Sequence, residues 1–158
     1  MIQKELFASM TVISMKMSFM FKGIYKVLKK YPLSLVVLAV IVYLSFFKPP
    51  TVSLSMVKHL DKFVHLVMYG GFCSVLWFEY FFTHCKVNFK KVLLWIFVAP
   101  ILFSGAVEFG QAYLTDYRGG EFADFVFNTV GVILAALFGV YVIHPFMKKH
   151  NLCGKRRF

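Results

Sequence analysis

Four apolar runs follow one another along the chain, and short segments with charged residues or prolines separate them. The runs cover residues 31–47, 63–82, 92–109 and 122–143. An α-helix rises about 1.5 Å per residue, so a segment of roughly 20 apolar residues crosses the hydrocarbon core of a bilayer. The pattern therefore predicts an all-α polytopic membrane protein with four transmembrane helices.

Prolines mark the ends of the first run and the middle of the third. Pro32 lies at the start of the first run, and Pro49 and Pro50 follow its end. Pro100 lies inside the third run. A proline there removes one backbone hydrogen bond without ending a membrane helix, because neighbouring groups can satisfy the freed carbonyl. We expect a kink there rather than a break.

The first 30 residues form a basic segment with a two-sided pattern. At 100° per residue, apolar and basic side chains fall on opposite sides of a helix. The apolar side consists of Met17, Met20, Phe21, Ile24 and Leu28, and the basic side of Lys22, Lys26, Lys29 and Lys30. This pattern is typical of an amphipathic helix that lies in the membrane interface and is attracted to anionic lipid. A basic leader that only fixes the topology is an equally good interpretation.

The composition supports a membrane protein and argues against a nucleic-acid partner. Hydrophobic residues make up 59% of the 158-residue chain, against about 45–50% in soluble domains, and the mean hydropathy is +0.71. The formal charge of +11 would suggest nucleic acid in a soluble protein. Here the basic residues lie mainly at the ends of apolar runs, where they orient membrane proteins. We expect membrane lipids, and no nucleic acid, as partners.

Lysine and arginine residues are distributed unevenly between the two sides of the predicted membrane domain. Fourteen of the 18 lie in the first 30 residues, in the connection after the second run and in the C-terminal tail. The positive-inside rule places these segments in the cytoplasm. The sequence thus predicts a multi-pass membrane protein with both termini in the cytoplasm. It consists of a leader (residues 1–30), a membrane domain (31–146) and a basic tail (147–158).

The three cysteines do not indicate a disulfide framework or a metal site. Cys73 falls in a predicted span, and Cys85 and Cys153 fall on the predicted cytoplasmic side. Their spacing is not that of zinc ligands, and disulfides are rare in the cytoplasm. We expect no cofactor and assign no metal site.

Three helix ends on the predicted outer side each carry a pair of polar residues at helical spacing. Residues three or four positions apart project from one face of a helix. The pairs are Asp61 with His65, Glu108 with Gln111, and Asp124 with Asn128. Ionisable groups cost roughly 2.5–3.5 kcal/mol each at the centre of a membrane helix, so they normally share a polar interior. We expect the pairs to form one pocket, with Lys62 and Arg118 as the balancing cations.

Simpler roles remain open for the same residues. Asp61 and Asp124 lie where the start of a helix favours a carboxylate, and Asn128 could serve only to hold helices together. Glu108 is harder to explain as structural, because a carboxylate at the C-terminal end of a helix opposes the helix dipole and needs a cation. Glu79, near the inner end of the second run, is expected to extend toward the interface.

Small residues continue the polar face of the fourth run. Gly131, Ala135 and Gly139 follow Asn128 at helical spacing. A series of small residues three to four positions apart lets two membrane helices approach closely. We expect this series to form the close-packed floor of the pocket.

The polar residues also resemble the motifs of the VanZ-like family of small bacterial membrane proteins. Three pieces occur in order: Asp61-Lys62-x-x-His65-x-x-x-Tyr69, then Glu108-x-x-Gln111, then Arg118 followed by Asp124-x-x-x-Asn128-x-x-Gly131. The resemblance covers residues 61–141 and leaves the leader and the tail outside. It implies a multi-span envelope protein of the bacterial inner membrane and adds Tyr69 to the pocket. The family is named for a member associated with resistance to the glycopeptide antibiotic teicoplanin, and it has no settled biochemical activity.

We favour a binding function over an enzymatic one. In this hypothesis the pocket binds a lipid-linked envelope precursor, a lipid headgroup or a glycopeptide. Arg118 and Lys62 would meet its phosphate or carboxylate, and the acids and amides would hydrogen-bond its sugar or peptide.

Two alternatives remain. The first is a membrane-embedded enzyme that acts on such a lipid, with His65 or Glu108 as the acid or base. One version adds a divalent metal held by Asp61, His65, Glu108 and Asp124. No nucleophile motif is present, so we assign no catalytic residue. The second is a structural or assembly partner, in which the polar groups only lock the helices together.

Overall fold

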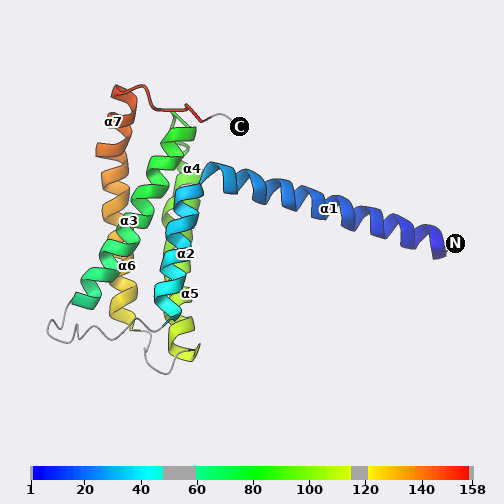
Figure 1. Ribbon diagram of the computed structural model, residues 1–158, viewed down its shortest axis with the longest axis horizontal. Helices are drawn as coiled ribbons and strands as arrows, with labels where there is room; N and C mark the ends of the chain where they lie inside the picture. Colours follow the sequence, from blue (N-terminus) through cyan, green and yellow to red (C-terminus); the bar gives the residue numbers. More distant parts are fainter. Residues whose placement is uncertain (1, 48–59, 115–120, 157–158) are drawn as a thin grey trace.

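The computed structural model describes residues 2–47, 60–114 and 121–156, and these residues are almost entirely helical (Figure 1). The α-helices are α1 (Ile2–Lys30), α2 (Pro32–Phe46), α3 (Leu60–Thr83), α4 (Phe89–Val92), α5 (Ala99–Leu114), α6 (Phe122–Phe138) and α7 (His144–Lys149). Two π-helical segments, Leu93–Val98 and Gly139–Ile143, connect α4 to α5 and α6 to α7. The described residues contain no strand, which confirms the all-α prediction for them.

Three continuous helices in the described part of the chain are long and apolar enough to cross a membrane. They are α3, the helix Phe89–Leu114 and the helix Phe122–Lys149. Helix α2 has 15 residues and is therefore only about 22 Å long. It reaches a sufficient length only together with residues 13–30 of α1, from which it is bent by 94°. The structure thus supports three spans, or four if this bent pair counts as one, and the predicted topology stays a prediction.

The helix that contains Pro100 runs through the proline without a break, as predicted. The six residues before Ala99 form a π-helix, and the N–H of Ala99 donates to the carbonyl of Leu94. A π-turn widens the helix and moves each hydrogen bond to a carbonyl one residue further back. A π-turn also precedes Pro145, where the N–H of His144 donates to the carbonyl of Gly139. The wide turns therefore keep the helices continuous where prolines would otherwise interrupt them.

Helices α3 and α6 form the most closely packed pair, and they lie side by side along the bundle (Figure 1). A Cβ atom on Gly131 would collide with the carbonyl oxygen of Leu66 and would lie 2.9 Å from the amide nitrogen of Gly70. One on Gly139 would overlap the indole ring of Trp77, and Ala135 between them is buried. The small-residue series therefore packs against the backbone and ring surface of α3.

Glu79 lies near the C-terminal end of α3, and its carboxylate caps the start of α2. Its carboxylate accepts hydrogen bonds from the backbone N–H groups of Leu33 and Ser34, both at 3.0 Å, and from the Ser34 hydroxyl at 2.6 Å. A carboxylate at the start of a helix satisfies orphan N–H groups and complements the helix dipole. The side chain is buried, so the expectation that Glu79 extends toward the interface is wrong.

The C-terminal tail closes over this same end of the bundle. The N–H groups of Gly154 and Arg156 donate to the carbonyls of Phe81 and Phe82, near the end of α3. The Arg156 guanidinium lies 3.8 Å from the Glu79 carboxylate, with its side chain one-third exposed. We call this end, where α1 meets α2 and the tail packs, the basic end.

Helix α1 leaves the bundle at the basic end and extends away from it (Figure 1). Its apolar side chains from Met10 onward are largely exposed, for example Phe19 at 82%. The structure thus confirms a helix in the leader, whereas its predicted place in the membrane interface stays a prediction.

Candidate functional site

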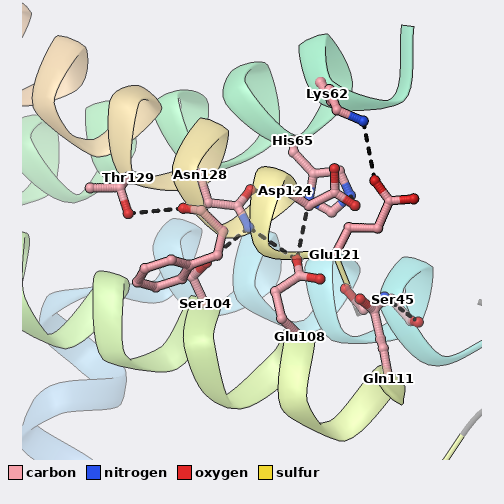
Figure 2. A network of polar contacts seen from close by, with 11 residues as sticks. Ser45, Lys62, His65, Ser104, Glu108, Gln111, Glu121, Asp124, Asn128 and Thr129 are labelled. Carbon is pink, nitrogen blue, oxygen red and sulfur yellow. Dashed lines mark hydrogen bonds and ion pairs between the residues drawn. The ribbon is translucent and has the colours of Figure 1, made fainter. Parts of the chain in front are cut away.

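Buried polar side chains gather at the other end of the bundle, where α3 and α6 begin and α2 and α5 end (Figures 1 and 2). We call this the polar end. Three helices contribute the residues that we call the polar cluster: His65 from α3, Ser104 and Glu108 from α5, and Asp124 and Asn128 from α6. Each of them is less than 10% exposed. The structure therefore brings together at least one member of each of the three predicted pairs.

Asn128 lies at the centre of the polar cluster and contacts three other residues (Figure 2). Its amide nitrogen donates to the Ser104 hydroxyl at 2.8 Å and to Glu108 Oε1 at 3.2 Å. Its amide oxygen lies 3.1 Å from Nδ1 of His65. Because an amide oxygen only accepts hydrogen bonds, Nδ1 must carry the proton and donate it. Asn128 thereby fixes the tautomer of a neutral His65, with the lone pair on Nε2.

His65 lies between two carboxylates. Its Nδ1 atom is 3.6 Å from Glu108 Oε1, and its Nε2 atom is 3.6 Å from Asp124 Oδ2. Both separations exceed the usual length of a hydrogen bond. The Nε2 atom therefore lies opposite a carboxylate oxygen of Asp124, at the distance of an ion pair if the ring is protonated.

Asp61 extends this arrangement to the surface of the polar end. It lies in the first turn of α3 and is exposed. One ligand atom each from Asp61, His65 and Asp124 all lie within 4.8 Å of one another. Among the described residues this is the one group of His, Cys, Asp or Glu side chains close enough to hold a metal ion.

The remaining predicted pocket residues have other surroundings. The Gln111 amide nitrogen donates to the carbonyl of Ser45 at 2.8 Å, which ties α5 to the end of α2. Lys62 pairs with Glu121 at 3.2 Å on the surface. Tyr69 is buried deeper on α3 in an apolar cluster with Ile41 and Val132, and its side chain also lies near Ser104 and Glu108 of the polar cluster. Arg118 lies outside the described residues.

Three residues of the polar end were not predicted from the sequence to take part in it. Ser104 precedes Glu108 by four positions, so helical spacing could have identified it on the same face of α5. Glu121 could not be matched to Lys62 from spacing, because the two residues come from different helices. Nothing in the sequence distinguishes the carbonyl of Ser45 as a hydrogen-bond partner, since every residue has a backbone carbonyl.

The described part of the polar end is acidic. Asp61, Glu108 and Asp124 surround His65, while Lys62 is engaged by Glu121. An arrangement of this kind can hold protons or cations and can hydrogen-bond a neutral polar group. A positive charge among these carboxylates would favour an anionic ligand.

Comparison with known proteins gives one match. A family model described as VanZ/LLP1 matches residues 4–144. No curated protein and no solved structure matches the chain. The matched segment starts within the leader, so the expectation that the family likeness is confined to residues 61–141 is wrong.

Proposed function

The chain belongs to the VanZ/LLP1 family, and from this premise we propose that its polar end faces outward and binds the head of a bacterial envelope component. The proposed ligand is a phosphate-bearing lipid, such as a lipid-linked envelope precursor. The proposal includes a contribution to resistance against glycopeptide antibiotics of the teicoplanin type, because such antibiotics would compete for envelope precursors.

The observation that carries this proposal is the concentration of buried polar groups at one end of a membrane bundle. Ionisable residues in membrane helices are costly and usually mark functional sites. A network that served only to lock helices together would be expected to satisfy all its own atoms. Asp124 Oδ1 is buried without a hydrogen-bond partner among the described residues, which favours a ligand over a purely structural role.

The outward orientation rests on charge. The basic end carries the leader, the segment after α3 and the tail, which together contain 14 of the 18 basic residues. The positive-inside rule favours the cytoplasm for such segments. The 94° bend between α1 and α2 is also what an interfacial helix beside a spanning bundle requires. Both features support a polar end at the outer surface.

A second candidate function is acid–base catalysis on the same class of lipid. It is favoured by one observation, the orientation of His65 through its Nδ1 contact with Asn128, which is how a general base is held in place. His65 or Glu108 would then move the proton. The sequence contains no recognisable nucleophile motif, so we rank catalysis below binding.

Arg118 provides a test of phosphate binding. We expect Arg118→Ala to weaken binding of a polyprenyl phosphate to the full chain in nanodiscs by about tenfold or more, because a guanidinium contacts phosphate through two charge-assisted hydrogen bonds. The matched control is Arg156→Ala at the basic end, which should bind as the wild type does. Equal affinity of Arg118→Ala and wild type, or an equal loss in both variants, would contradict the proposal.

A further inference from the structure

The distance between the facing atoms of His65 and Asp124 is close to that between two ligand atoms of one metal ion. Two ligand atoms that bind one ion at about 2.0–2.2 Å lie roughly 3.0–3.6 Å apart. His65 Nε2 and Asp124 Oδ2 are separated by 3.6 Å, and a carboxylate oxygen of Asp61 completes the group within 4.8 Å. Asp61 and Asp124 come from the first turns of α3 and α6, and His65 lies one turn further along α3. The starts of two helices thus bring three possible ligand atoms near one another.

The tautomer of His65 adds a chemical argument. Since Nδ1 donates to Asn128, the Nε2 atom of a neutral ring presents its lone pair toward the Asp124 carboxylate. The two electron-rich atoms repel each other unless Nε2 carries a proton or a metal ion lies between them. Histidine ligands in metal sites are oriented in this way, with the second ring nitrogen donating to an oxygen of the protein. The contact with Asn128 therefore prepares His65 to coordinate through Nε2.

Asp124 gives an independent indication of a ligand. Its side chain is 2% exposed, and its Oδ1 atom has no hydrogen-bond partner among the described residues. A buried carboxylate oxygen without a partner is costly. Asp61 is exposed at the polar end, where an ion could approach the group.

We propose that Asp61, His65 and Asp124 bind a divalent cation of the Mn²⁺ or Zn²⁺ class. An imidazole together with carboxylates suits these ions, and three protein ligands leave coordination positions open. This proposal departs from our sequence-based expectation of no metal site. Glu108 is not a ligand in this site, because it faces the Nδ1 side of the ring.

The cation would also explain how an acidic site takes an anionic ligand. A phosphate oxygen can occupy an open position on the ion, which offsets the carboxylates around it. This part of the inference rests on the proposed function, whereas the metal site itself does not.

The test uses the full chain in nanodiscs, freed of metal with a chelator and then titrated with MnCl₂ or ZnCl₂. We expect one ion per chain by calorimetry and by elemental analysis. Asp61→Asn should weaken the affinity by at least about tenfold, because it removes the negative charge of the one exposed ligand. The matched control is Glu121→Gln, a nearby surface carboxylate that lies outside the group, and it should bind within about twofold of wild type. Thermal unfolding of each variant checks that the fold is intact.

Several outcomes would overturn the inference. The site is absent if neither ion binds stoichiometrically, or if Glu121→Gln loses as much affinity as Asp61→Asn. A parallel titration with polyprenyl phosphate, with and without chelator, separates this inference from the proposed function. Metal binding without phosphate binding leaves the metal site standing and removes the proposed function. Phosphate binding that is insensitive both to chelator and to Asp61→Asn leaves the function standing and removes the bridging cation.

Discussion

Asn128→Leu should lower the free energy of unfolding by about 2–4 kcal/mol, the largest effect expected for one side chain in the polar cluster. Asn128 is fully buried and forms hydrogen bonds with Ser104, Glu108 and His65. Hydrogen bonds between membrane helices average roughly 0.6 kcal/mol and reach about 1.7 kcal/mol, and three of them are lost together. The measurement is the thermal or denaturant unfolding of the purified protein in detergent.

The matched control lies one residue away. Thr129 donates its hydroxyl only to the carbonyl of Phe125 in its own helix, among the contacts that the structure describes. Thr129→Val keeps the shape and loses this local bond, so its stability should stay within about 0.5 kcal/mol of wild type. If Asn128→Leu were as stable as Thr129→Val, the polar cluster would not connect α3, α5 and α6 in the way described.

Gly131→Ala should destabilise the protein by about 3 kcal/mol, near the upper end of what overpacking usually costs. The new Cβ atom would meet backbone atoms of Leu66 and Gly70, which cannot move aside like a flexible side chain. Helices α3 and α6 would have to separate, and the polar cluster would open with them. The midpoint of thermal unfolding in detergent measures this loss.

Gly71 provides the control for this substitution. It lies beside Gly70 on α3, but a Cβ atom there would meet nothing within 4 Å. Gly71→Ala should leave stability unchanged or raise it slightly, because alanine favours a helix more than glycine does. Equal loss in Gly131→Ala and Gly71→Ala would show that helix propensity, and not the approach of α3 and α6, explains the effect.

The sequence was sufficient to predict what depends on hydropathy and helical period. The apolar runs predicted the helices, and the spacing of Asp61, His65, Asp124 and Asn128 placed these residues on facing surfaces of α3 and α6. The series that begins at Gly131 predicted a close helix contact. In each case a periodic pattern within one helix carries the information.

Partners from different helices could not be predicted in this way. Which carbonyl Gln111 reaches, and which carboxylate Lys62 meets, depends on the lateral positions and rotations of neighbouring helices. The same applies to Glu79, whose partners belong to the start of α2, 45 residues away in the case of Ser34. The π-turn before Pro100 also escaped prediction, because hydropathy does not distinguish a π-turn from an α-turn.

The central claim is that the polar end acts on the bacterial envelope, and Glu108→Gln tests it most directly. The variant replaces a buried carboxyl group of the polar cluster by an amide and keeps an oxygen that can still accept the hydrogen bond from Asn128. The measurement is the sensitivity to teicoplanin-type and other envelope-directed antibiotics of a strain that lacks the protein and carries wild type or variant at equal membrane abundance. We predict that wild type restores the sensitivity profile of the parent strain and that Glu108→Gln does not, although its unfolding midpoint is close to wild type. Full restoration by Glu108→Gln would contradict the account.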